Sequence, residues 1–598
     1  MSTTSVDGEY KADRALNVEV GLELVSTSIS ADEEKPRLRG WRLTSLTIGL
    51  AIAVFLSSLD AIIVSTSLAA IAEDLQAFDK SSWVVSSYLT TYFSFLIIWA
   101  KISDLVGRKV MLITALAIFL GFSGGCGGAQ TILQLIILRA FQGAGGAGIF
   151  SMVPIITAEM VHPDKYAVYN AIMAFSIALS FLLGPLIGGV IADNTSWRWI
   201  FYINLPPGAV GILLVWLSMP GAFPDLSKPT SLWNFPKNVD FHRRVDYPGF
   251  GLLLTASVFL IVAIEEAAVL YTWGNAVVIV LLVLSFVLVG AFLTWTWFLH
   301  RSDSSREPVF LWEFVKNRIF MGTCLMTLLS GVPLVTLVLG LPGRFQILNN
   351  TSAFDSGIRI LPLTLTIAVS SALAGGLTAR GRVPPLVVFS AAAALQLVGL
   401  GLLYSVPTGS PLSARLYGYQ TLIGIGVGIS LATAILTVPS LVGENGMSGA
   451  LGSIVQFRVL GGAVGLSVAT NLLNNAVQDR LQGQIGPDVL HNIMKNISTM
   501  VSLPDSTQML IRGAFADGYQ RQLLVYAANG DASGLQSLFD LKKTSSFDVC
   551  SVKRQSALRY AISKNQLDVC EFLLQEQAGP FLEDRTNLYD KLTLQFGL

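Results

Sequence analysis

Residues 101–110 read KISDLVGRKV and place three charged side chains, Asp104, Arg108 and Lys109, between two long apolar runs. The whole chain is 52% hydrophobic and only 13% charged, whereas soluble domains carry about 25% charged residues. This composition indicates a membrane protein, in which the charged segment joins two membrane-spanning helices. Gly107 permits the tight reversal that such a turn needs. The stretch therefore predicts an all-α polytopic membrane fold.

The charge balance excludes several classes of partner. The 39 basic and 39 acidic residues cancel, so no global field attracts nucleic acid. The four cysteines have neither the pairing nor the spacing of a disulfide framework or a metal site. The chain also lacks a P-loop, a nucleophile elbow and a zinc motif. We expect no metal, no cofactor and no enzymatic activity.

Apolar runs of membrane-spanning length recur along most of the chain. About 20 apolar residues cross the hydrocarbon core of a bilayer. Thirteen runs reach roughly this length, in groups of six, two and five: 45–69, 83–102, 110–128, 132–153, 167–191 and 199–219; 247–271 and 275–299; 319–341, 356–378, 384–405, 415–438 and 447–473.

These runs define the expected domains. The chain should begin with a disordered cytosolic tail, continue through two helical bundles separated by an inserted helix pair, and end in a polar tail. The boundaries are 1–44 for the N-terminal tail, 45–219 for the first six-helix bundle, 220–300 for the cytosolic loop and inserted helices, 301–477 for a C-terminal bundle with five recognisable helices, 478–522 for an outer loop and the lead-in to a missing helix, and 523–598 for the C-terminal tail.

Basic residues in the short loops determine the expected orientation, because Lys and Arg collect on the cytosolic side. With the N-terminus inside, the basic loops, including the turn at 101–110, fall on the cytosolic side. N-x-S/T sequons are glycosylated only on the lumenal side. All four sequons lie in predicted outer loops and are candidate glycosylation sites: Asn194, Asn349, Asn350 and Asn496.

Asp104 suggests a second role for the charged turn. An acid contributes little to topology, so Asp104 is expected to hold Arg108 or to interact with the N-terminus of a neighbouring helix. A contact of this kind would form and break as the helices rock, which makes Asp104, Gly107, Arg108 and Lys109 candidates for conformational gating. A purely topogenic turn is the alternative.

Polar and ionisable side chains within the apolar runs are candidates for proton coupling or for the substrate pathway. A central cation costs about 3 kcal/mol on insertion scales, so Arg139 should face a partner or an aqueous cavity. Gln142 would share its helix face. Asp60 lies deep in the first run, either as a titrating or substrate-facing carboxylate or as a hydrogen-bonded structural acid. Arg458 precedes a glycine cluster as Arg139 does.

Glu265 and Glu266 form an adjacent pair in the seventh run. Neighbouring residues of a helix point to different faces, so at most one of these acids should face a cavity. We favour a surface pair that snorkels toward water.

Five motifs, in matching order and spacing, resemble the major facilitator superfamily, and specifically its fourteen-helix drug:proton antiporter branch of fungal toxin and drug efflux pumps. They are SLDAIIVSTSL (58–68), AKISDLVGRK (100–109), LRAFQGAGGAG (138–148), FLLGPLIGGV (181–190) and WRWIFYINLPPG (197–208). The resemblance covers about residues 45–520. It implies two six-helix bundles around a central site plus two inserted helices, and a part for Arg139 in proton coupling.

The motif GPLIGG combines a helix-breaking proline with glycines that leave a smooth helix face. An ordinary membrane kink would also explain it. In the family this motif marks exporters rather than importers, so Gly184, Pro185, Gly188 and Gly189 favour efflux over uptake. Arg344 stands where the family more often has an uncharged residue, which implies a substrate contact or a local disruption.

The C-terminal part departs from the family. No apolar run of spanning length follows IRGAFADGYQRQ (511–522), so the last helix is expected to be missing. Residues 523–598 instead resemble ankyrin repeats, with Ala527 and Ala561 spaced close to the period of about 33 residues. A fused or misassembled reading frame, a degraded pump and a real tail module are the open interpretations.

The expected function is proton-coupled efflux of amphipathic small organic molecules, such as a toxin, a secondary metabolite or a drug, by alternating access. A nutrient facilitator, and a non-transporting membrane scaffold or sensor with an ankyrin-like interaction tail, are the alternatives. We expect a multi-pass monomer in the plasma membrane, with the vacuolar membrane as the alternative. Its partners would be protons, a small-molecule substrate and the lipid bilayer.

Overall fold

The computed structural model describes residues 38–76, 80, 82–220, 223, 243–269, 273–302, 306–379, 385–406, 413–442, 446–486, 489 and 503–532. Within these ranges the chain is helical, apart from two isolated β-bridges. Twelve of the described helices are long and apolar enough to cross a membrane. A lipid environment requires this, because a helix satisfies its backbone hydrogen bonds internally.

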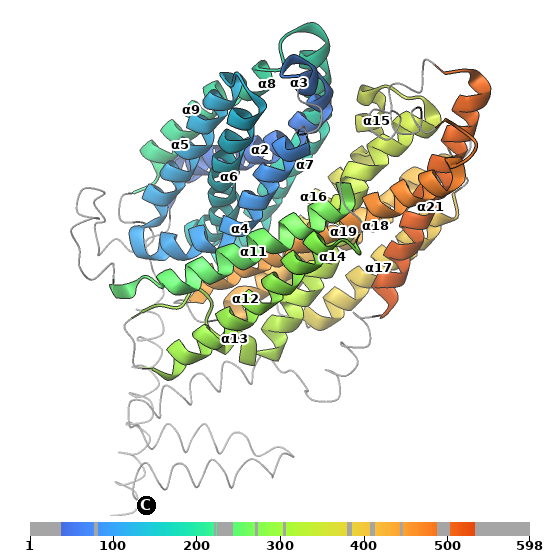
Figure 1. Ribbon diagram of the computed structural model, residues 1–598. Helices are drawn as coiled ribbons and strands as arrows, with labels where there is room; N and C mark the ends of the chain where they lie inside the picture. The colour runs from blue at the N-terminus through green and yellow to red at the C-terminus, as the bar shows by residue number, and fades with distance from the viewer. Residues whose placement is uncertain are drawn as a thin grey trace, which may run out of the picture. The chain divides into compact units, whose positions relative to one another are not determined.

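The first group of helices lies together in the blue to teal part of Figure 1. It consists of α2 (Trp41–Thr66), α3 (Leu68–Asp74), α4 (Ser82–Val106), α5 (Arg108–Gly127), α6 (Ile132–Met160), α7 (Pro163–Asn194), α8 (Trp199–Tyr202) and α9 (Leu205–Ser218). Helices α8 and α9 form one spanning segment, Trp199–Ser218. The predicted first six-helix group therefore corresponds to helices throughout.

The inserted pair and the second group follow in the chain. The pair is α11 (Tyr247–Val269) and α12 (Ala276–Arg301), and the second group contains α13 (Trp312–Lys316), α14 (Arg318–Asn349), α15 (Ala353–Arg359), α16 (Leu361–Ala379), α17 (Pro385–Tyr404), α18 (Arg415–Leu441) and α19 (Met447–Leu481). Helix α16 corresponds to the tenth predicted run, 356–378, and its apolar part, Leu361–Ala374, is shorter than the twelve candidate spans.

One further helix corrects the sequence prediction. Residues expected to form a lead-in to a missing helix instead form α21, Asp505–Ala532, which packs against α14, α17 and α19. Its charged residues, among them Arg512 and Asp517, conceal it from a hydropathy count, and packing stabilises it instead. This helix continues across the predicted boundary at residue 522. The remainder of the ankyrin-like tail, 533–598, lies outside the described residues.

Glycines bring the helices of the first bundle into close contact. A Cβ atom on Gly145 of α6 would lie 2.6 Å from the backbone nitrogen of Phe119 in α5, and one on Gly143 would collide with the Tyr88 carbonyl of α4. Gly461 of α19 meets the backbone of Leu328 in α14 in the same way. Such small-residue contacts are the usual basis of helix packing in membranes.

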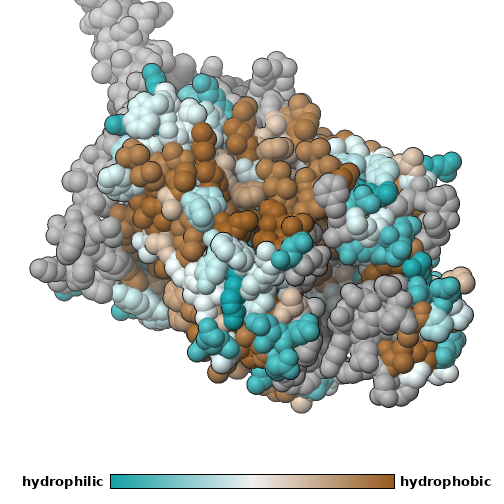
Figure 2. Space-filling view, turned by 90° about the horizontal axis from the view of Figure 1, so that it is seen from above, coloured by the Kyte–Doolittle hydropathy of each residue, from teal (hydrophilic) through white to brown (hydrophobic). Residues whose placement is uncertain are grey.

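The outside of the helical part is apolar where lipid would lie. Helix α12 exposes Val280, Phe286 and Val287, each at least 60% accessible. Figure 2 shows a broad hydrophobic area on one face of the molecule, bordered by hydrophilic side chains. Exposed apolar surface of this extent fits a chain solvated by a bilayer.

Candidate functional site

A buried ion pair joins two helices of the first bundle. Asp60 of α2 and Arg139 of α6 are 79 residues apart in sequence, and Nη1 of the arginine donates to a carboxylate oxygen of Asp60. Both side chains have 0% exposure. Because a lone charge at this depth costs several kcal/mol, each group stabilises the burial of the other.

Three more side chains complete the site. Gln142 donates to Oδ1 of Asp60 at 2.9 Å and accepts from Nη1 of Arg139 at 2.8 Å. Asn204 donates to the same Asp60 oxygen at 3.1 Å. The Tyr88 ring centroid lies 4.1 Å from Cζ of Arg139, which is a cation–π contact. We call Asp60, Tyr88, Arg139, Gln142 and Asn204 the buried polar cluster.

Asp60 is the one acid of the buried polar cluster, and Arg139 is its one cation. Nη2 of Arg139 is buried and has no hydrogen-bond partner among the described residues. Across those residues, no group of three His, Cys, Asp or Glu side chains is placed to hold a metal ion.

Arg458 does not join this cluster. It lies on α19 in the second bundle, with its Cζ 5.4 Å from the ring centroid of Phe150 in α6. No carboxylate of the described residues pairs with it within 4.0 Å. The structure therefore places this cation where a helix of one bundle meets a helix of the other.

The charged turn at residues 101–110 forms a compact network at one end of the first bundle. Gly107, with φ at +111°, begins α5 in a conformation that favours glycine. Nη2 of Arg108 lies 2.6 Å from Asp104 and 2.8 Å from Glu159 at the end of α6. Lys109 donates to the carbonyl oxygens of Trp216 and Met219 at 2.7 and 2.6 Å, where α9 ends.

Asp104 also reaches across to the second bundle. The Ser448 hydroxyl donates to its carboxylate, and Ser448 lies in the first turn of α19. The two residues are 344 positions apart. The positive end of the α19 dipole faces this carboxylate, which is the favourable orientation for an acid. The contact with a neighbouring helix end, inferred from sequence as one option, is present beside the contact with Arg108.

A second ionic contact lies next to the turn. Glu307 accepts from Lys101 at 3.0 Å and from Nε of Arg244 at 2.9 Å. Partial burial alone would raise the pKa of the Glu307 carboxyl group. The hydrogen bonds and charges of Arg244 and Lys101 outweigh this effect, so the pKa is lowered from its ordinary value.

The GPLIGG motif lies in α7 and brings this helix against α2. A Cβ atom on Gly184 would lie 3.1 Å from Cγ2 of Ile62, and the Gly188 carbonyl accepts from the Ser67 hydroxyl at 3.2 Å. Pro185 and Gly189 belong to the same helix. The motif thus contacts the helix that carries Asp60.

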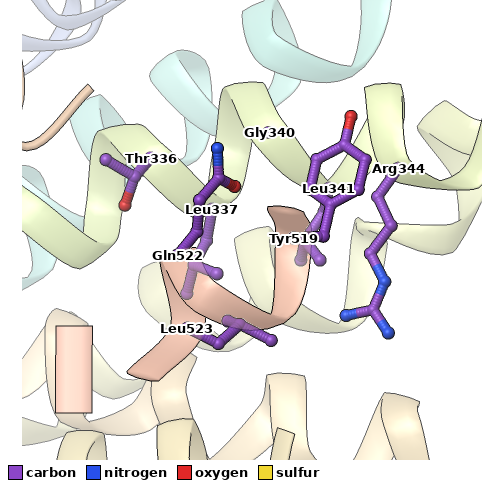
Figure 3. Close-up of a pocket in the computed structure, with 8 residues that line it drawn as sticks. All are labelled: Thr336, Leu337, Gly340, Leu341, Arg344, Tyr519, Gln522 and Leu523. Carbon is purple, nitrogen blue, oxygen red and sulfur yellow. The ribbon is translucent and has the colours of Figure 1, made fainter. Parts of the chain in front are cut away.

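Arg344 lies in the second bundle beside a small cavity of about 20 Å³ between α14 and α21. The arginine is 5% exposed, and its Nη1 has no hydrogen-bond partner within the described part of the chain. Figure 3 shows Arg344 and Tyr519 side by side at this cavity, with Gln522 beside Leu337. Helix α21, absent from the sequence prediction, contributes three of the eight lining residues.

The sequons occupy helix ends where they are described. Asn194 is the last residue of α7, Asn349 is the last residue of α14, and Asn350 caps α14 with φ at +52°. Asn496 lies outside the described residues.

Sequence reasoning missed several members of these networks. Asn204 stands in the quoted motif WRWIFYINLPPG as a polar residue in an apolar run, and Glu159 ends an apolar run near the level of Arg108, so both carried a detectable signal. Tyr88 and Ser448 resemble many other polar residues of apolar helices and carried none. Only their positions in space single them out.

Two helical bundles, an inserted helix pair and ionisable groups buried within the bundles define a polytopic membrane transporter. The profile of the Major Facilitator Superfamily matches residues 50–466. The chain belongs to this superfamily, whose members are transporters and not enzymes.

Fungal transporters are similar to the chain over most of their length. The MFS-type transporter FPY5 of Fusarium mangiferae is 39% identical over 518 residues, covering 87% of this chain and 86% of the relative. The MFS thioclapurine efflux transporter tcpA of Claviceps purpurea is 29% identical over 481 residues, covering 79% of this chain and 86% of the relative.

A solved structure shares the fold. A bacterial homologue of the human lysosomal transporter Spinster, in an inward-facing and occupied conformation, superposes with a TM-score of 0.53 at 13% identity, covering 85% of this chain and 98% of that chain.

Proposed function

We propose that this transporter exports amphipathic small organic molecules and that proton entry drives the export. The observation that carries the proposal is the fully buried pair of Asp60 and Arg139. A proton arriving at Asp60 would weaken the pair, and its departure would restore it, so the cycle could couple proton movement to a change in packing around Arg139.

The direction and the substrate class rest on the relatives. One of them is named as a thioclapurine efflux transporter, and another as an efflux pump, roqT of Penicillium rubens, 29% identical over 474 residues. These relatives favour efflux over a nutrient facilitator or a scaffold. We extend the class to toxins, secondary metabolites and drugs, because all of these are amphipathic organic compounds that an apolar cavity with a few polar groups can accept.

The gate of this cycle is the contact between the charged turn and the second bundle. Asp104 meets Ser448 at the start of α19, and Lys101 meets Glu307 beside it. Both contacts join segments far apart in the chain, so separation of the bundles at this end would break them together. We propose that their breakage opens the cytosolic side.

Helix α21 completes the second bundle in this proposal. Six segments in each bundle and two inserted helices then match the fourteen-helix branch, and the even number places the C-terminal tail with its ankyrin-like sequence on the cytosolic side. The tail is an appended module that transport does not need. The protein would act as a monomer in the plasma membrane, with the vacuolar membrane as the alternative, and Asn194, Asn349 and Asn350 would be glycosylated.

Proteoliposomes with an imposed pH gradient test the function. The purified full-length protein should move the amphipathic dye rhodamine 6G against its gradient when protons run in the opposite direction, and the ionophore nigericin should stop this movement. Asp60→Asn and Arg139→Gln should each lose the gradient-driven component. Matched controls are Asn350→Gln, at an exposed helix cap, and empty liposomes.

Equal dye movement with and without the pH gradient would overturn proton coupling. Undiminished gradient-driven transport in both Asp60→Asn and Arg139→Gln would overturn the assignment of the buried pair.

A further inference from the structure

Helix α11 lies between the two bundles. It packs against α4 of the first bundle and α19 of the second, and Figure 1 shows it running beside the α4 and α19 labels. Hydrogen bonds from α19 fasten it at successive levels: Gln456 to the Ser257 hydroxyl at 3.4 Å, Ser467 to the Ile264 carbonyl at 2.7 Å and Asn471 to the Ala267 carbonyl at 3.0 Å. The second bundle therefore holds α11 along much of its length.

Glu265 lies on α11 between Ile264 and Ala267, whose carbonyl groups accept hydrogen bonds from α19. Its carboxyl group lies beside the hydroxyl group of Ser86, near the start of α4. Its Oε2 is buried and has no hydrogen-bond partner among the residues described. The structure thus corrects the expectation of a snorkelling surface pair, because Oε2 of Glu265 is buried and the Glu266 side chain is only 9% exposed.

No cation balances this carboxyl group. Among the described residues, no Lys, Arg or His nitrogen forms an ion pair with Glu265 within 4.0 Å. A buried carboxylate without a cation or a full set of hydrogen bonds is costly in an apolar interior, and binding a proton removes that cost.

The neighbouring helices add no compensating charge at this level. The one titratable neighbour that acts on Glu265 is Glu266 on its own helix, a like charge. Helix α4 presents the hydroxyl group of Ser86, α19 presents Ser467 and Asn471, and the adjoining start of α12 is the apolar run 276–284.

The position connects this acid to both bundles. A protonated carboxyl group can donate to its neighbours and remain buried, whereas an ionised one gains by moving toward water. Proton release would therefore loosen the contact of α11 with α4 while α19 still holds α11. Thr90 lies one helical turn after Ser86 on α4. Its Oγ1 is also buried and has no hydrogen-bond partner in the described ranges, so α4 carries a second polar group in register with Ser86.

We propose that Glu265 is a proton-binding site of the transport cycle, supplied by the inserted helix and placed at the contact of α11 with α4. This inference rests on the proposed proton coupling and adds a second carboxyl group, distant in sequence from Asp60. The inserted pair then takes a direct part in coupling.

Infrared difference spectroscopy on the full-length protein in liposomes tests the site without any substrate. During a pH titration, the wild type should show the carbonyl stretch of a buried protonated carboxyl group, which disappears as the pH rises. Glu265→Gln should lose the part of this band that Glu265 contributes and keep only the contribution of Asp60, whereas the matched control Glu266→Gln should keep the full band. Persistence of the full band in Glu265→Gln would overturn the proposal.

Transport of rhodamine 6G tests the role of the site in the cycle. Glu265→Gln should slow gradient-driven efflux by about tenfold and flatten its pH profile, whereas Glu266→Gln should match the wild type. An unchanged pH profile in Glu265→Gln would overturn the role in the cycle. If the wild type ignores the pH gradient, the proposed function fails, and the infrared band alone decides whether Glu265 binds a proton.

Discussion

Replacing Asp60 by asparagine should separate the structural role of the buried pair from its role in coupling. Asp60 accepts hydrogen bonds from Arg139, Gln142 and Asn204. Asparagine has nearly the same shape, but it has one acceptor oxygen and no charge. Arg139 would keep its positive charge at 0% exposure without a counter-ion.

The expected loss of stability is large. Removal of one partner from a buried ion pair costs about 3–5 kcal/mol, because the other charge remains buried. The ring of Tyr88 lies 4.1 Å from Cζ of Arg139. This contact is present in the wild type and in Asp60→Asn, so it does not reduce the difference in stability between them. The double variant Asp60→Asn/Arg139→Gln removes both charges, so it should regain most of the lost stability.

The assay compares thermal unfolding of the purified protein with dye transport in liposomes. Asp60→Asn should unfold at a clearly lower temperature, and the double variant should unfold near the wild type. Gradient-driven transport should be absent in both. A double variant that is less stable than either single variant, or one that transports as the wild type does, would refute this account of the buried pair.

Three further predictions concern the gate and the C-terminal part. Asp104→Asn should slow dye turnover more than it weakens dye binding, because the carboxylate contacts the start of α19; equal turnover in the variant and the wild type would favour a purely topogenic turn. The lowered pKa of Glu307 means that its ion pairs stabilise the fold at neutral pH and lose this effect as the pH falls through that lowered pKa. The difference in thermal stability between the wild type and Glu307→Gln, below about 1 kcal/mol for such a half-exposed contact, should therefore vanish in acid, and a pH-independent difference would contradict the ionic explanation. Deletion of 533–598 should leave dye transport intact. A C-terminal tag on the full-length protein should resist protease added outside intact cells, because α21 returns the chain to the cytosol; cleavage of that tag would show that α21 does not cross the membrane.

Local physical chemistry made most of the helical layout predictable. An apolar run of spanning length in a membrane must form a helix, since no other arrangement satisfies its backbone groups. For this reason the thirteen predicted runs all correspond to helices. Helix α21 escaped because its residues are too polar for a hydropathy count, and it depends on its packing against α14, α17 and α19.

A candidate residue could be predicted where the free-energy cost of burying its charge is evident from its own helix. Asp60 and Arg139 stand out in the sequence because a charged side chain within an apolar membrane helix is energetically costly. The same logic did not distinguish Glu265 from Glu266, since the packing of α11 decides that Oε2 of Glu265 is buried without a hydrogen-bond partner among the described residues.

Tertiary structure alone decided the partners that lie far apart in the chain. The sequence marked Asp60, Arg139 and Asp104 as residues that need partners. The pairing of Asp60 with Arg139 across 79 residues, and of Asp104 with Ser448 across 344, follows from how the helices rotate and pack. Hydropathy acts on each segment separately, whereas a contact between helices depends on the shapes of both faces, and no single segment contains that information.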